Sequence, residues 1–166
     1  MTNKSILHNR AMEQLLQQDM GSERDAKLCR GIEEEITHYL QELRDSGTYI
    51  LPRYVYEQYD PEGKILSTED RVSWEWDYNE FYIEPKLVGK QPGGALRYTF
   101  EFLCEKLLEK FPNRRFRIVL SVSKDDPDPG IIIHCFQYQE GNSVIDLNLE
   151  HYTGEAILYA VIDRDI

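Results

Sequence analysis

Polar and apolar residues alternate most clearly between positions 115 and 138. The first half of this stretch has the period of a half-buried strand, because every second side chain is apolar. Those apolar side chains are Phe116, Ile118, Leu120 and Val122. Residues 126–130, Asp-Pro-Asp-Pro-Gly, have the composition of a turn. A second apolar segment follows at 131–138, so the pattern predicts a long β-hairpin at the centre of a mainly antiparallel sheet.

Apolar residues at helical spacing predict two long helices and a weaker third one. Between Ser22 and Gly47 they recur every three or four positions, and we expect Ser22 as the N-cap and Gly47 as the residue that ends the helix. A second stripe runs over Ala95–Phe111 and stops before Pro112. Residues 5–20 carry a weaker amphipathic pattern, which predicts a helix near the start of the chain.

The remaining segments are predicted as strands. Tyr49–Tyr59 is rich in residues that favour strands, and Arg71–Ile83 alternates aromatic with polar or acidic residues. Val144–Leu149 is predicted to form a further strand. The predicted last strand, Ala156–Ile162, is apolar on both faces, so we expect helices or a partner to cover each of them. We therefore predict a single α+β domain over residues 1–166. Its mainly antiparallel, twisted sheet of about five or six strands is packed by two N-terminal helices and one mid-chain helix.

This order of elements resembles that of the cone-shaped α+β domains of the nuclear transport factor 2-like family. The resemblance rests on the two N-terminal helices, the mid-chain helix and the C-terminal strands. A cone of this kind would place a pocket between the sheet and the helices. We expect His134, Tyr138 and an aromatic residue of segment 71–83 to line such a pocket.

The net charge of −11 over 166 residues limits the partners of the chain. Nucleic acids and anionic membranes attract basic surfaces, so neither is an expected partner. A basic protein is the partner that this charge favours. The three cysteines form no metal-binding or redox motif, and the sequence has neither a secretory signal nor an apolar run long enough to span a bilayer. These features predict a cytoplasmic protein without a cofactor.

The aromatic and acidic segment near position 76 is the predicted protein-binding site. Trp and Tyr often anchor protein interfaces, and carboxylates between them would meet a basic partner. The residues are Trp74, Glu75, Trp76, Asp77, Tyr78 and Glu80. The alternative is that the two tryptophans pack on the helices while the other strand face stays acidic. The acidic turn Asp125, Asp126 and Asp128 would add negative charge, and it lacks the ligand spacing of a calcium loop, so we predict no metal there.

Two functions remain open from the sequence. The first is a non-catalytic binding protein, such as an acidic inhibitor or immunity protein that neutralises a basic protein partner. The second is a ligand-binding or enzymatic cone with a pocket at His134 and Tyr138. Phosphate loops, dinucleotide glycines and serine hydrolase elbows are absent from the sequence, which favours the first function. A homodimer is also predicted, because Tyr98, Phe102 and the two-sided strand 156–162 offer apolar surface for self-association.

Overall fold

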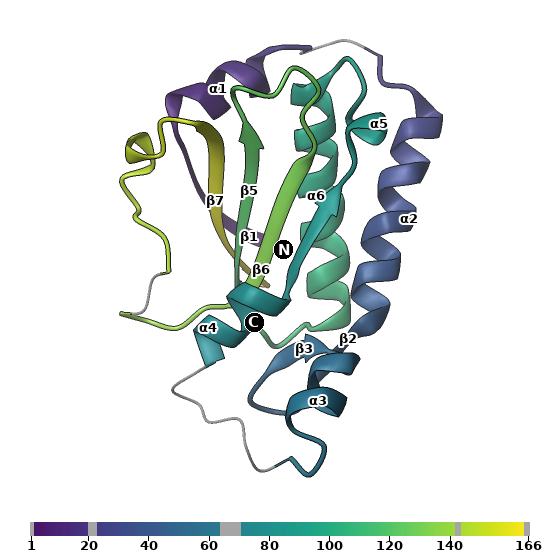
Figure 1. Ribbon diagram of the computed structural model, residues 1–166, viewed down its shortest axis with the longest axis vertical. Helices are drawn as coiled ribbons and strands as arrows, with labels where there is room; N and C mark the ends of the chain where they lie inside the picture. Colours follow the sequence, from purple (N-terminus) through teal and green to yellow (C-terminus); the bar gives the residue numbers. More distant parts are fainter. Residues whose placement is uncertain (1, 20–22, 64–70, 142–143, 165–166) are drawn as a thin grey trace.

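The computed structural model describes residues 2–19, 23–63, 71–141 and 144–164. It confirms the α+β class: a five-stranded antiparallel sheet in the order β1-β7-β5-β6-β4 packs against helices (Figure 1). The strands, in sheet order, are β1 (Thr2–His8), β7 (Glu155–Arg164), β5 (Phe116–Ser123), β6 (Ile131–Gln137) and β4 (Glu80–Ile83). A separate two-stranded sheet joins β2 (Leu43–Asp45) to β3 (Ile50–Pro52).

The predicted central hairpin is confirmed. Strand β5 occupies the middle of the sheet and pairs with β6 from Phe116 opposite Gln137 to Ser121 opposite Ile132. In the turn between the two strands, the backbone N–H of Asp128 donates to the carboxylate of Asp126. The aspartates therefore serve the turn as the sequence predicts.

Three helices cover one face of the sheet. They are α1 (Arg10–Gln17), α2 (Ala26–Glu42) and α6 (Pro92–Lys110), and α2 and α6 run side by side in Figure 1. The buried side of α6 includes Leu96, Leu103 and Leu107, which join the alternate apolar residues of β5 and β6 in the main core. No helix in the described ranges is both long enough and apolar enough to cross a membrane.

The ends of the first two helices differ from the prediction. Residues 5–8 belong to β1, because Asn9 both ends that strand and caps α1: its side-chain oxygen accepts hydrogen bonds from the N–H groups of Met12 and Ile157. The N-cap of α2 is Asp25, whereas Ser22 lies outside the described residues. Gly47 does not end α2; it has a φ of 94° in the turn between β2 and β3.

Two segments predicted as strands form helices instead. Strand β3 covers only the start of segment 49–59, and Pro52 caps helix α3 (Arg53–Tyr59). Segment 71–83 begins with helix α4 (Arg71–Tyr78), and only β4 at its end is extended. The alternation of apolar residues misled the prediction because Val72 and Trp76 are four apart, which also places them on one face of a helix.

The last strand is covered on both faces by this chain. On one face of β7, Leu158 and Ile162 pack in the helix-covered core. On the other face, Ile157 and Tyr159 pack with α4 and with residues 145–152. Segment 144–149 is therefore not the predicted strand: its buried residues cover the sheet, and it leads into a short 3₁₀ helix, η2 (Leu149–His151). A short helix α5 (Pro85–Val88) interrupts the predicted loop before α6.

Candidate functional site

The predicted protein-binding segment is divided between α4 and β4. Within it, Asp77 and Glu80 are exposed, and the aromatic side chains are partly buried. Glu75 is completely buried, at 0% exposure, so its interpretation as an exposed acidic side chain is wrong. The reason is the helix: α4 turns Glu75 toward the sheet and the β2–β3 unit, whereas a strand would have placed it beside Asp77 on a polar face.

The carboxylate of Glu75 links helix α4 to strands β6 and β3. Its Oε1 accepts from the backbone N–H of Gln137 at 2.8 Å, and its Oε2 accepts from the side chain of Gln137 at 2.8 Å and the backbone N–H of Ile50 at 3.3 Å. Strand β4 pairs only with residues 131–134 of β6, so Glu75 bonds the part of β6 that β4 does not reach. Burial raises the pKa of Glu75 to about 7, although these donors oppose the rise.

His134 and Tyr138, the predicted pocket residues, are engaged separately. The ring of Trp76 stacks on His134 with centroids 3.8 Å apart and planes 2° apart. His134 Nδ1 lies 3.0 Å from the carbonyl oxygen of Trp76. Tyr138 instead lies against the guanidinium groups of Arg115 and Arg117, whose central carbons are 4.1 and 4.7 Å from the centroid of the Tyr138 ring. Phe136, which contacts Trp76, lies between them on the same face of β6.

An open hollow of about 330 Å³ lies beside β4, and we call it the tyrosine–glutamate hollow. Helix α2 forms one wall with four residues at positions i, i+3, i+4 and i+7, which share one helix face. Strand β4, the end of α4 and the β3–α3 junction form the rest. The lining residues are Glu35, His38, Tyr39, Glu42, Pro52, Tyr54, Tyr78, Glu80, Phe81 and Tyr82.

Aromatic rings make up much of this hollow. Tyr39 stacks on Phe81 with centroids 4.0 Å apart, and its hydroxyl donates to the carbonyl of Asn79 at 3.0 Å, which fixes the wall between α2 and β4. Burial raises the pKa of the Tyr39 hydroxyl, so it stays neutral. Tyr54 and Tyr82 are 52% and 48% exposed, which leaves their rings available at the rim.

The hollow is also acidic. Glu35, Glu42 and Glu80 contribute three carboxylates, and the one titratable base in the lining is His38. The carboxylate of Glu80 also lies 3.5 Å from Nε2 of His134. A cation gains from both components, since aromatic faces attract ammonium and guanidinium groups and carboxylates form charge-assisted hydrogen bonds with them. The described residues contain no group of three or more His, Cys, Asp or Glu side chains that could hold a metal ion. The aromatic rings and carboxylates together suit a lysine or arginine side chain.

The hairpin turn between β5 and β6 adds exposed acidic residues, and Gly130 at its end lies against a rim tyrosine of the hollow. Asp125, Asp126 and Asp128 are exposed at the tip of the β5–β6 hairpin. The following Gly130 lies under the ring of Tyr82: a Cβ added at Gly130 would come within 2.3 Å of the Tyr82 hydroxyl oxygen. Negative charge is thus present both in the hollow and in the hairpin turn.

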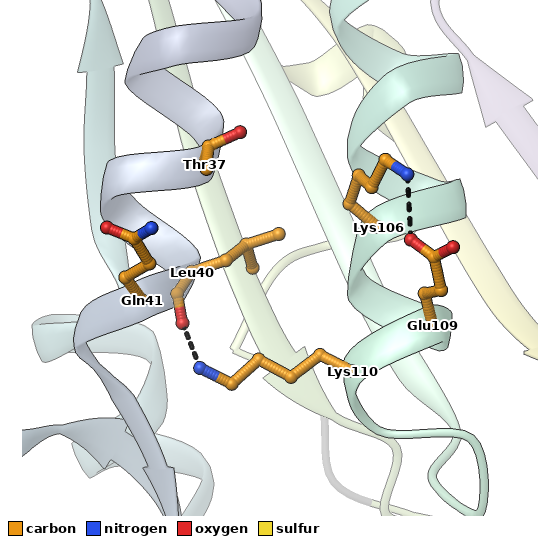
Figure 2. Close-up of a pocket in the computed structure, with 6 residues that line it drawn as sticks. All are labelled: Thr37, Leu40, Gln41, Lys106, Glu109 and Lys110. Carbon is orange, nitrogen blue, oxygen red and sulfur yellow. Dashed lines mark hydrogen bonds and ion pairs between the residues drawn. The ribbon is translucent and has the colours of Figure 1, made fainter.

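Figure 2 shows a second hollow, of about 310 Å³, between α2 and α6. Its polar groups bond to one another. The ammonium group of Lys110 donates to the carbonyl of Leu40 near the end of α2, and Lys106 pairs with Glu109 at 2.8 Å. The Lys110 contact joins the two helices, and the pair of Lys106 and Glu109 lies within α6, so both serve the fold.

Comparisons with protein-family models, with curated proteins and with solved structures give no match to this chain. The candidate site therefore rests on its own geometry.

Of the predicted site residues, Tyr78 and Glu80 line the hollow. Trp74 stacks on Tyr78 at 5.2 Å and supports it from behind, whereas Asp77 lies on the exposed side of α4. The contribution of α2 and of the two rim tyrosines, Tyr54 and Tyr82, is not predicted from the sequence. The spacing of Glu35, His38, Tyr39 and Glu42 was a usable signal, because it places acidic and aromatic side chains on one helix face.

Proposed function

We propose that this chain is a non-catalytic binding protein that neutralises a basic partner protein, in the manner of an acidic inhibitor or immunity protein. The observation that carries the proposal is the tyrosine–glutamate hollow, where three carboxylates and five aromatic rings share one open surface. A lysine or arginine of the partner enters this hollow. The exposed Tyr54 and Tyr82 contact its aliphatic part, and the glutamates pair with its charge.

The charge of the chain supports the same partner. A net charge of −11 attracts a basic protein before contact and so raises the association rate. The exposed turn at Asp125, Asp126 and Asp128 acts in this long-range attraction, since its side chains point to solvent. We expect the hollow to determine the dissociation rate and the surrounding charges to determine the association rate.

The experiment compares three baits in one lysate of the source cell: the unchanged chain, Glu80→Lys and Glu105→Lys. Both variants make the same change of charge, but Glu105 is exposed on α6, away from the hollow. The proposal expects a basic protein that is captured by the unchanged chain and by Glu105→Lys and is lost with Glu80→Lys. Binding kinetics of that protein should then show an association rate that falls as salt shortens the Debye length from about 10 Å at 0.1 M to about 3 Å at 1 M. An acidic partner, or one that binds both variants equally, would contradict the proposal.

A further inference from the structure

Strand β1 is an open edge of the sheet. It pairs with β7 on one side only, and all seven of its residues are exposed. Ile6 and Leu7 are 44% and 45% exposed. Edge strands in soluble proteins are usually protected by proline, bulges, lysine or other inward charges, or short length. Strand β1 has one such feature, Lys4, whose ammonium group lies over the ring of Phe100, but it is long, evenly paired and free of proline and of acidic residues.

The direction of the unpaired backbone groups follows from Asn9. Its N–H donates to the carbonyl of Ile157 in β7, at the point where β1 ends. Backbone groups alternate in direction along an antiparallel strand. The N–H and C=O groups of residues 3, 5 and 7 therefore point toward β7, and those of Lys4, Ile6 and His8 point away from it. Outside the β1–β7 ladder, no backbone–backbone hydrogen bond joins residues 4–8 to another described residue. The open edge therefore presents a regular set of donors and acceptors.

We propose that a second copy of this chain pairs its own β1 with this edge, antiparallel and about a twofold axis at Ser5. In this register all seven residues of each strand find a partner. Residues whose backbone N–H and C=O groups point away from β7 lie opposite one another, Lys4 opposite Ile6 and Thr2 opposite His8, so these groups form the hydrogen bonds between the two copies. The two five-stranded sheets become one continuous sheet. Ser5 lies opposite Ser5 of the second copy in a pair without backbone hydrogen bonds, where side chains are closest.

A second copy fits this edge because the Ser5 register is self-complementary and places no two like charges opposite each other. The chain carries a net charge of −11, so two copies repel each other over most surfaces, but β1 contains Lys4 and His8 and no carboxylate. The Ser5 register also keeps Lys4 away from Lys4 of the second copy. A register centred on Ile6 would pair only residues 4–8 and would place Lys4 opposite His8, so it is the weaker arrangement.

A hollow behind β1 adds apolar contact to this pairing. It measures about 440 Å³ and lies between β1 and α6. Its lining combines apolar side chains with charged or titratable ones: Ile6, Leu16, Leu96, Phe100 and Leu158, and Lys4, His8, Arg97 and Glu101. Lys4 and Ile6 lie on the same side of the sheet as this hollow. Ile6 of the second copy, opposite Lys4, therefore packs at its mouth and covers apolar surface that is open in one chain alone.

The test uses sedimentation equilibrium and a cysteine cross-link on the full chain. The unchanged chain should approach the mass of two chains as its concentration rises, and Ile6→Lys, which places a lysine opposite Lys4, should weaken association about tenfold or more. Ser5→Cys, made together with Cys29→Ser, should form a disulfide-linked dimer under mild oxidation, because only Cys104 and Cys135 remain and both are buried. Ser73→Cys in the same background places an exposed cysteine on α4 and should stay monomeric.

Each outcome decides the proposal. A chain that sediments as a monomer at every concentration would overturn it, as would an Ile6→Lys variant that associates as strongly as the unchanged chain. Equal cross-linking of Ser5→Cys and Ser73→Cys would also overturn it, because random collision would then explain both. A dimer that cross-links through Ile6→Cys instead of Ser5→Cys would keep the β1 interface and disprove the register.

Discussion

The two edges of the five-stranded sheet differ in length, charge and attachment. Strand β1 has seven exposed residues and no carboxylate, whereas β4 has four residues, begins with Glu80 and borders a hollow with two further glutamates. A chain with a net charge of −11 thus keeps one edge strand free of carboxylates, although Glu101 of α6 lines the hollow behind it. This separation allows two kinds of contact: another acidic copy at β1 and a basic partner at β4.

The two edges are also held in place by different interactions. Strand β1 is attached by a regular ladder to β7, and its side chains contribute little burial. Strand β4 pairs with only part of β6, and buried side chains secure the region around it. Glu75 bonds β6 and β3, Asn79 donates to the carbonyl of Ile50 at 2.7 Å, and Tyr39 bonds the backbone of Asn79. Substitutions near β4 should therefore lower the free energy of unfolding, and substitutions in β1 should weaken self-association.

Glu75→Ala should have the largest effect on folding. It leaves the N–H groups of Ile50 and Gln137 without their acceptor in a buried site, and we expect a loss of about 3 kcal/mol in the free energy of unfolding. Asp77→Ala on the same helix is the control and should change stability by less than about 0.5 kcal/mol, because Asp77 is exposed. Denaturant melts measure both values. Similar losses for the two variants would show that the Glu75 contacts do not secure the β4 end.

The same carboxyl should make stability depend on pH. Its pKa is about 7 in the folded chain and 4.5 without burial. At pH values between these two pKa values, the folded state keeps a proton that the unfolded state releases. The free energy of unfolding should therefore be highest below about pH 4.5, fall by up to about 3 kcal/mol as pH rises to about 7, and then stay level with respect to this group. Urea melts across this range test the expectation. Glu75→Gln, which does not titrate, should lose this component, and an unchanged pH profile in that variant would assign the dependence to other groups.

Gly130→Ala should disturb the β4 edge more moderately. The added Cβ would lie 2.3 Å from the ring of Tyr82 and 2.5 Å from the carbonyl oxygen of Ile83. The tyrosine can move, but the backbone of β4 must shift, so we expect a loss of about 1–3 kcal/mol. Gly154→Ala is the control, because no atom lies within 4 Å of its added Cβ. Partner binding at the hollow should also weaken in Gly130→Ala, since Tyr82 is displaced; thermal melts and binding kinetics together check both effects.

The sequence predicted the centre of the sheet better than either edge. The hairpin of β5 and β6 has long, regular alternation and turn residues that leave one interpretation. At the β4 edge, Val72 with Trp76 and Trp74 with Tyr78 are four apart, a spacing that fits a strand and a helix equally. Tertiary packing decided for the helix, because α4 places Val72 and Trp76 on the sheet and Glu75 against Gln137.

The candidate site was only partly predictable for the same reason. Once segment 71–78 was interpreted as a strand, Glu75 was expected on the surface and Trp76 in a binding face. The acidic and aromatic face of α2 is visible in the sequence, but nothing local shows that it meets β4. Strand β1 was also hidden, because residues 5–8 continue into the amphipathic pattern of α1 and only the cap at Asn9 separates them.

The smallest expected effect on folding is that of Ile6→Lys on the isolated chain. Ile6 is 44% exposed, its backbone ladder to β7 does not depend on its side chain, and lysine can lay its methylene groups over the same surface. At concentrations where the chain is monomeric, the free energy of unfolding should therefore change by less than about 0.5 kcal/mol. At higher concentrations the unchanged chain should gain stability through self-association, because a dimer that forms only from folded chains raises the melting temperature. Melts of both proteins over a dilution series separate the two effects. If Ile6→Lys destabilises the dilute chain as much as Glu75→Ala does, β1 is a structural edge like β4 and the contrast between the two edges is wrong.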